Sequence, residues 1–266
     1  MLTPMAMQED FEVFKNSISD IHPGLYWYSD SSEVEARFNK IESAITQDLP
    51  LRDFYALVQE FYAAINCGHS WMQKPKAWTN LLDSGNYRLP FDIYFEDSVF
   101  TIENDLTDNQ EVEIGAKVIA INGVSMIEII DNLKRYAISD GFNQTRRFNF
   151  VASNFYQLYQ LHYDLTDTFE IELYSPDLEE NITQTFQGLS KVMYQSIKAE
   201  RYKVKPSGKI RPLAQLRIDE GIGYLDINTF EKDWLKSRGI KYKKFLTNSF
   251  SQLKEQGINK LILDIR

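Results

Sequence analysis

Apolar residues recur every three or four positions through residues 1–70, and this spacing predicts three amphipathic helices in succession. Pro23 and Gly24 end the first helix, because both residues disfavour its continuation. Ser32 lies three positions before Glu35, the spacing of a capping box at the start of the second helix. The apolar faces are predicted to consist of Phe11, Phe14, Ile18 and Ile21; Val34, Phe38, Ile41 and Ile45; and Leu51, Phe54, Val58, Phe61 and Ile65. We therefore expect a helical domain over residues 1–75.

After Pro75 the apolar pattern changes to the shorter runs of β-branched and aromatic residues that are typical of strands. The predicted elements are strands over 89–102, 112–121 and 168–174 and a helix over 125–137. Asn122-Gly123 indicates a tight turn after the second strand, because both residues tolerate positive φ. Residues 148–163 are rich in Phe and Tyr, which leaves helix and strand both open. Together these elements predict a compact α+β domain over residues 86–175.

The remaining residues, 176–266, are expected to form a connector and the truncated start of an α/β core. Proline, glycine and polar residues over 175–217 predict strands and loops. The predicted elements after them are a strand over 222–227, a helix over 242–254 and a strand over 260–265. The helix would turn Phe245, Phe250 and Leu253 inward and end at Gly257. Such a βαβ unit belongs to a sheet covered on both faces, so we expect chain outside these residues to complete it. The fold class is therefore α+β and multidomain.

Composition excludes several classes of function. The chain of 266 residues is 43% hydrophobic and 25% charged, an ordinary globular balance, and its net charge of −9 disfavours nucleic acid as a partner. The basic stretch over 191–217 is interpreted as a solvated connector or a surface strand pair, with a polyanion site as the alternative. No apolar run is long enough to span a membrane, and residues 1–11 lack the pattern of a signal peptide. A single cysteine excludes an internal disulfide and predicts no cysteine-based metal site.

Three segments of the chain carry recognisable motifs. The first segment joins His22-Pro23-Gly24-Leu25-Tyr26 and the helix over 51–61 to Cys67-Gly68-His69-Ser70. The second, residues 114–123, is similar to a PDZ hairpin, with Ala116 where aspartate is usual. The third joins residues 223–230 to Leu261-Ile262-Leu263-Asp264-Ile265-Arg266. In this order the three segments resemble the N-terminal helical domain, the PDZ-like domain and the opening of the peptidase core of the C-terminal-processing (tail-specific) serine peptidase family, whose core is tricorn-like or interphotoreceptor-retinoid-binding-like.

The resemblance implies a serine-type endopeptidase that cleaves polypeptides near the C-terminus. It covers the N-terminal portion of the family only, because in the family a glycine-rich turn and the nucleophilic serine follow the third segment. Residues 1–266 alone are therefore expected to be inactive. The resemblance also suggests a periplasmic or exported protein with a polypeptide substrate and no cofactor, while the compartment and the oligomeric state stay open. The rival hypothesis is a non-catalytic protein on the same fold that binds peptides or a hydrophobic ligand.

By this resemblance, His69 is the candidate catalytic base, and Ser70 a candidate neighbour in its hydrogen-bond network. Family members of the serine–lysine type need no such histidine, and His69 would then only cap a helix or be buried. His22 is expected to be structural because it lies in a Pro-Gly turn, and His162, in the aromatic run, is expected to pack or to lie at the surface. The three histidines show no metal-ligand spacing, so no metal site is predicted. A PDZ-like domain binds an extended peptide along a strand edge, which makes the segment Leu89-Pro90-Phe91 the candidate substrate-binding segment. The alternative is that this domain only supports the core.

Overall fold

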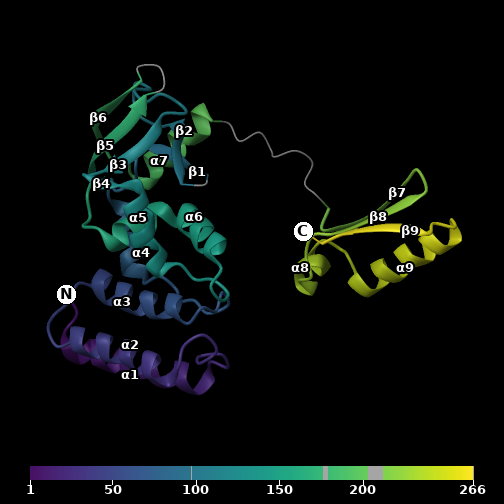
Figure 1. Ribbon diagram of the computed structural model, residues 1–266, viewed down its shortest axis with the longest axis horizontal. Coiled ribbons are helices and arrows are strands. Elements are labelled where there is room, and N and C mark those ends of the chain that lie inside the picture. The colour runs from purple at the N-terminus through teal and green to yellow at the C-terminus, as the bar shows by residue number, and fades with distance from the viewer. Residues whose placement is uncertain (97, 176–178, 203–211, 266) are drawn as a thin grey trace. The chain divides into compact units, whose positions relative to one another are not determined.

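The computed structural model describes residues 1–265 with the exception of 97, 176–178 and 203–211 (Figure 1). The chain divides into two compact units, Met1–Lys203 (unit 1) and Val204–Arg266 (unit 2). Helices and largely antiparallel sheets alternate along both, which confirms the α+β multidomain class. The domain boundaries predicted at residues 75, 86 and 175 stay predictions.

Unit 1 begins with the three predicted helices, α1 (Pro4–Ile21), α2 (Ser31–Ala44) and α3 (Leu51–Ala64), which lie alongside one another in Figure 1. Their apolar faces meet in one core, where the Phe38 and Phe61 rings stack with their centroids 4.6 Å apart. Phe11 packs edge-on against Phe38 at 6.1 Å. The helical spacing of these apolar residues therefore predicted the helices and most of their buried faces, but Ile21, which was predicted on the inner face of α1, is exposed.

The capping box of α2 lies two residues before the predicted one. The Asp30 carboxylate accepts from the Glu33 backbone N–H at 2.9 Å, and the Glu33 carboxylate accepts from the Asp30 N–H at 3.2 Å. Ser32 instead donates its hydroxyl to Asp30 at 2.6 Å. The predicted pairing of Ser32 with Glu35 is wrong, because Asp30 is also a good cap and starts the helix earlier.

The sheet of unit 1 is antiparallel, with the order β1-β2-β3-β5-β6 and the short β4 paired to β3. Its strands are β1 (Phe91–Glu96), β2 (Val99–Asp105), β3 (Lys117–Ile121), β4 (Val124–Ser125), β5 (Thr168–Ser175) and β6 (Glu180–Gln187). The predicted turn after β3 is confirmed, since Asn122 and Gly123 have φ values of 50° and 75°. The second predicted strand is shorter than expected, because residues 112–116 lie outside β3. In the strand order given above β1 comes at one end, so it forms one edge of the sheet.

Among the described residues of unit 1, five helical segments accompany this sheet: α4 (Lys76–Ser84), α5 (Met126–Leu133), η1 (Lys134–Tyr136), α6 (Gln144–His162) and α7 (Lys191–Arg201). The predicted helix over 125–137 is confirmed as α5 and η1, and Ser125 caps it. The ambiguous aromatic stretch is the helix α6, which is kinked at Asn154. The sequence interpretation missed α4 and α7. Among the described residues, no helix is both long and apolar enough to cross a membrane.

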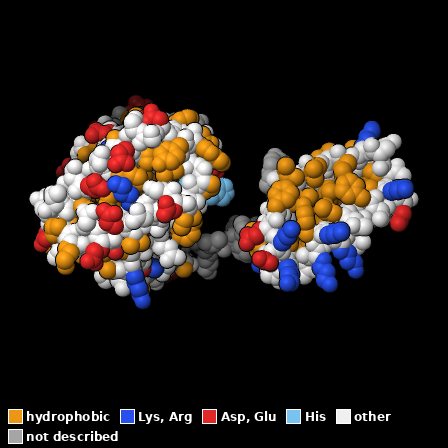
Figure 2. All heavy atoms as spheres, turned by 90° about the horizontal axis from the view of Figure 1, so that it is seen from below, with side chains coloured by type: hydrophobic (Ala, Val, Ile, Leu, Met, Phe, Trp, Pro, Cys, Tyr) orange, Lys and Arg blue, Asp and Glu red, His pale blue; other side chains and the backbone are white. Residues whose placement is uncertain are grey.

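Unit 2 contains β7 (Ala214–Asp219), β8 (Ile222–Ile227), α8 (Lys232–Ser237), α9 (Tyr242–Glu255) and β9 (Lys260–Asp264). β8 and β9 are parallel and α9 connects them, which confirms the predicted βαβ unit. Gly223 lets α9 pack closely on β8, because a Cβ there would lie 2.4 Å from the Leu253 side chain. Phe250 is exposed, so its predicted inward orientation is wrong, whereas Leu253 is buried. Figure 2 shows hydrophobic side chains gathered on the visible face of this unit.

Candidate functional site

The candidate base His69 lies on a tight turn directly after α3. Asn66 leaves the helix with φ of 58°, a left-handed conformation that asparagine tolerates better than most residues. The Ser70 N–H then donates to the Cys67 carbonyl at 3.1 Å, which closes the turn. His69 lies at the outer corner of this turn with 87% of its side chain exposed. The imidazole is therefore open to a reacting partner.

Asp140, which the sequence interpretation did not single out, reaches this turn from the loop after η1. Its Oδ1 accepts from the Gly68 N–H at 2.7 Å and lies 3.6 Å from the Nδ1 of His69. A Cβ at position 68 would lie only 2.8 Å from Oδ2 of Asp140. The turn therefore needs glycine at position 68 for the carboxylate to lie beside the imidazole.

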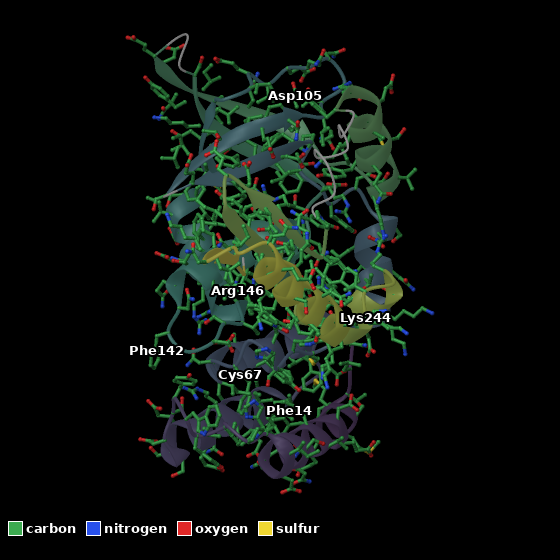
Figure 3. All side chains as sticks on the ribbon, turned by 90° about the vertical axis from the view of Figure 1, so that its right-hand side faces the viewer. Phe14, Cys67, Asp105, Phe142, Arg146 and Lys244 are labelled. Carbon is green, nitrogen blue, oxygen red and sulfur yellow. The ribbon has the colours of Figure 1, made fainter. Side chains whose placement is uncertain are left out.

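Hydrogen bonds fasten the two loops together. The Gly141 N–H donates to the Asn66 carbonyl at 2.8 Å. The Arg147 guanidinium, at the start of α6, donates to the Asn66 side-chain oxygen at 2.5 Å and to the Ala137 carbonyl at 2.8 Å. In Figure 3, Cys67 and Phe142, one from each loop, lie at the level where the N-terminal helices meet the rest of unit 1. The positions of His69 and Asp140 are thus fixed by bonds that bridge the loops.

Ser70 bonds to His22 and has no such bond to His69. Its Oγ lies 2.7 Å from Nε2 of His22, and Nδ1 of that ring accepts from the Gly24 N–H at 3.2 Å. An accepting Nδ1 carries no proton in the neutral ring, so Nε2–H is the donor and Ser70 the acceptor. In this tautomer His22 cannot take the Ser70 proton, which fits the structural role predicted for His22.

An exposed imidazole with a carboxylate at its Nδ1 has the arrangement of a general base and its orienting acid. Nδ1 faces Asp140, so Nε2 is the nitrogen left to accept a proton. The distance of 3.6 Å between Nδ1 of His69 and Oδ1 of Asp140 is longer than a hydrogen bond. Contacts of this kind often shorten only when substrate binds. No local motif could have found Asp140, because it lies 72 residues after Gly68 and its neighbours show no catalytic pattern.

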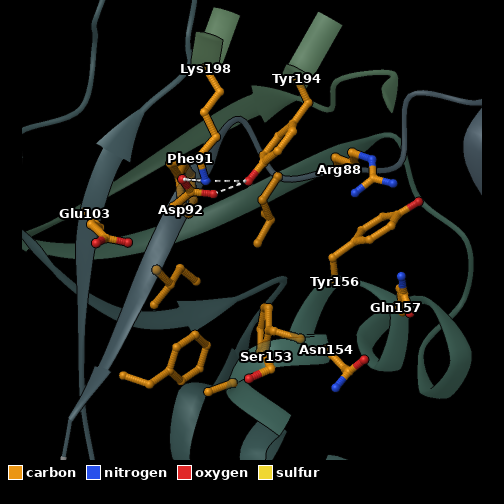
Figure 4. Close-up of a pocket in the computed structure, with 15 residues that line it drawn as sticks. Arg88, Phe91, Asp92, Glu103, Ser153, Asn154, Tyr156, Gln157, Tyr194 and Lys198 are labelled. Atoms are coloured by element: carbon orange, nitrogen blue, oxygen red, sulfur yellow. Dashed lines mark hydrogen bonds and ion pairs between the residues drawn. The ribbon is translucent and has the colours of Figure 1, made fainter. Parts of the chain in front are cut away.

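The predicted substrate-binding segment lies at the start of β1, beside a groove of about 300 Å³ between β1 and α6 (Figure 4). Leu89 and Phe91 line this groove, but both belong to the core and are almost fully buried. Pro90 does not line it, and its carbonyl accepts from the Leu106 N–H at 2.8 Å. The groove is lined by Arg88, Leu89, Phe91, Asp92, Ile93, Phe95, Glu103, Ala152, Ser153, Asn154, Phe155, Tyr156, Gln157, Tyr194 and Lys198.

The helix α7, which was not predicted, supplies polar groups to this groove. Figure 4 shows Tyr194 and Lys198 converging on Asp92 of β1, with the Lys198 Nζ 2.7 Å from the carboxylate and the Tyr194 hydroxyl hydrogen-bonded to it. Burial, together with the hydrogen bond to Asp92, raises the pKa of the Tyr194 hydroxyl. The Arg88 guanidinium lies 4.1 Å from the centre of the Tyr156 ring and 5.6 Å from the centre of the Tyr194 ring. The groove is therefore lined by both apolar and charged side chains.

No family model and no curated protein matches this chain. Three solved structures of the chlamydial protein CPAF are similar to it. A serine-to-alanine mutant of CPAF matches with a TM-score of 0.56 and 11% identity over 98% of this chain and 56% of the CPAF chain. Mature CPAF matches with a TM-score of 0.53 and 12% identity, and its lactacystin complex with 0.53 and 11%, each over 86% of this chain and 49% of the other. The chain thus spans about half the length of these CPAF chains, and at this identity the likeness shows a CPAF-like fold.

Proposed function

We propose that this chain belongs to a serine endopeptidase of the C-terminal-processing type in which His69 is the general base. The observation that carries the proposal is the exposed pair of His69 and Asp140 on two fastened loops. The similarity in fold to CPAF, a chlamydial serine protease, supports the same class of reaction. Polypeptides would then be the substrates.

In the proposed mechanism, Nε2 of His69 accepts the proton of a serine hydroxyl as the serine attacks the peptide carbonyl, and later returns it to the leaving amine. Asp140 holds Nδ1–H in place and stabilises the imidazolium that forms. Residues 1–266 would supply the base, its carboxylate and a recognition groove. The nucleophilic serine would come from chain outside these residues, so we expect no hydrolysis by residues 1–266 alone.

We infer further that the groove between β1 and α6 receives the substrate as an extended strand, in the manner of a PDZ domain. β1 is an edge strand, so a peptide can pair with its backbone while its side chains enter the groove. Ile93 and Phe95, which line the groove and are only partly buried, would contact apolar side chains, and Lys198 and Arg88 would lie near a terminal carboxylate. This recognition places the cleaved bond near the C-terminus of the substrate.

The test is proteolysis of an unstructured polypeptide by the product of the complete open reading frame that encodes these residues. His69→Ala is expected to lower kcat/KM by about 100-fold or more, because it removes the proton acceptor. Asp140→Asn is expected to lower it by about 10-fold or more, because the amide no longer stabilises the imidazolium. Asp131→Asn is the matched control, since Asp131 is an equally exposed aspartate (65% against 68%) on α5.

A second control tests whether the hydrogen-bonded pair of His22 and Ser70 takes part in catalysis. His22→Gln removes the ring bonded to Ser70 and should leave hydrolysis within about 3-fold of the wild type, because His22 donates to Ser70 in the neutral tautomer. Full activity in His69→Ala would contradict His69 as the base and favour the serine–lysine type. Peptide binding without hydrolysis in the wild type would favour the non-catalytic hypothesis.

A further inference from the structure

Three possible metal ligands of different chemistry meet at the turn after α3. The Cys67 sulfur, a ring nitrogen of His69 and a carboxylate oxygen of Asp140 all lie within 4.8 Å of one another. We propose that these three residues form a binding site for a borderline-soft divalent cation, with Zn²⁺ as its preferred metal. The spacing of the histidines could not predict this site, because Asp140 comes from a distant loop.

The separation of the nitrogen and oxygen donors is close to that of tetrahedral coordination. An ion bound at about 2.1 Å to nitrogen and to oxygen in a tetrahedron holds those two atoms roughly 3.4 Å apart. The Nδ1 of His69 and Oδ1 of Asp140 are 3.6 Å apart, which is too long for a hydrogen bond and close to this ligand spacing. Small side-chain movements would therefore be enough to admit a metal.

The donor set determines which metal is bound. Thiolate and imidazole favour Zn²⁺ and Co²⁺, whereas Mg²⁺ and Ca²⁺ prefer sites made of oxygen ligands only. On binding, the Cys67 thiol releases its proton to solvent and the sulfur bonds to the metal as thiolate. Three protein ligands leave a fourth tetrahedral position for water.

The surrounding hydrogen bonds hold the Asp140 carboxylate and the backbone of the two loops in place before the metal arrives. The Gly68 N–H orients the Asp140 carboxylate at 2.7 Å, and the Gly141 N–H fastens the two loops at Asn66. Bonds of this kind orient metal ligands and strengthen binding. The Arg147 guanidinium adds a bond to each side, to Asn66 and to Ala137. The thiol, the imidazole and the carboxylate are thus brought together by two loops of unit 1 that hydrogen bonds join.

Metal binding would regulate the proposed peptidase, because His69 cannot be a metal ligand and a general base at the same time. This regulatory consequence rests on the proposed function, whereas metal binding does not. The two can be tested separately, since binding is measured on the 266-residue chain without any substrate.

The experiment is a titration of the reduced chain with Co²⁺, followed by near-ultraviolet absorption, and a calorimetric titration with Zn²⁺. A bound thiolate gives a sulfur-to-cobalt charge-transfer band. We expect this band, a 1:1 ratio of metal to protein, and no heat of binding with Mg²⁺. Cys67→Ser should abolish the band, and His69→Gln and Asp140→Asn should each weaken Zn²⁺ binding by about 10-fold or more.

Two further variants test the geometry. Gly68→Ala keeps all three ligands but places a Cβ against the Asp140 carboxylate, so it should weaken Zn²⁺ binding, while Asp131→Asn should not. Absence of the band, or a band that survives in Cys67→Ser, would overturn the site. Unchanged Zn²⁺ affinity in both His69→Gln and Asp140→Asn would overturn it as well. If the site binds Zn²⁺ but Zn²⁺ does not inhibit an active parent protein, only the regulatory consequence is lost.

Discussion

The apolar strand β9 of unit 2 differs from the central strands of unit 1 in how much of it is covered. In unit 1, Ile121 of β3 and Ile171 of β5 are 0% exposed, because both belong to the core that the helices form with the sheet. In unit 2, the β9 residues Leu261, Ile262 and Leu263 are 42%, 49% and 54% exposed. An apolar run therefore predicts a strand, but only its neighbours decide how much of that strand is buried.

The sharpest test of this comparison makes the same substitution in both strands. Ile171→Ala is expected to cost about 2–5 kcal/mol of unfolding free energy, because it opens a cavity in a closed core. Ile262→Ala should cost less than about 1 kcal/mol, because half of its side chain is already in water. Urea denaturation with hydrogen exchange and mass spectrometry measures the two units separately.

Protein concentration provides the control. If Ile262→Ala costs the same unfolding free energy at low and at high protein concentration, β9 behaves as a free strand edge. A large cost of Ile262→Ala that appears only at high concentration would instead show that a second copy covers β9, and the comparison would then hold for the isolated chain only.

A smaller effect is expected within unit 1, between two neighbouring arginines. Arg147→Met should cost about 2 kcal/mol, because the Ala63, Lys134 and Ala137 carbonyls lose their charged donor. Arg146→Met should change stability by less than about 0.5 kcal/mol, because the Arg146 side chain is exposed. Chemical denaturation of the two variants measures the difference. Equal costs would show that the fastening of the two loops adds no stability.

The smallest effect concerns pH. Burial, aided by the positive charge of Arg135, lowers the pKa of the His162 imidazole from 6.5. As the pH drops below 6.5, His162 is protonated more readily in the unfolded chain than in the folded chain. The free energy of unfolding of unit 1 should therefore fall over this range. Residues 204–266 contain no histidine, so unit 2 lacks this contribution.

His162→Gln is the variant that isolates this histidine. Its unfolding free energy should fall less steeply than that of the wild type between about pH 7 and about pH 5, because the glutamine does not titrate. Parallel pH profiles of the two proteins would contradict a role for His162. The side chain also accepts a hydrogen bond from, or donates one to, the Tyr136 hydroxyl at 3.0 Å, so the slopes are compared and not the absolute stabilities.

Local apolar spacing was enough to predict much of the fold. The helices α1, α2, α3 and α9 and the turn at Asn122-Gly123 each follow from neighbouring residues. The helix α7 was missed because it buries no residue completely. It is held instead by distant polar partners, such as Asp92 for Lys198 and the Thr107 carbonyl for Arg201. Such partners leave no periodic signal along the chain.

The candidate site was only partly predictable for the same reason. The turn that carries His69 follows from the end of α3 and from the resemblance of its sequence to a peptidase motif. Asp140 could not be found, because its contact with Gly68 depends on how two loops meet. The partner of Ser70 was also missed, since His22 lies 48 residues earlier and reaches it through the packing of the helices. The catalytic roles of His69 and Ser70 stay predictions.

The bond between Gly68 and Asp140 also has a consequence for folding kinetics. It joins residues 72 positions apart, so the chain must close a long loop before the two meet, and such contacts form slowly compared with a helix. A short peptide containing residues 67–70 would carry the thiol and the imidazole but not the carboxylate. The complete cluster therefore forms only after this long loop has closed, and a cobalt signal recorded during refolding would report when the loop after α3 and the loop after η1 have come together.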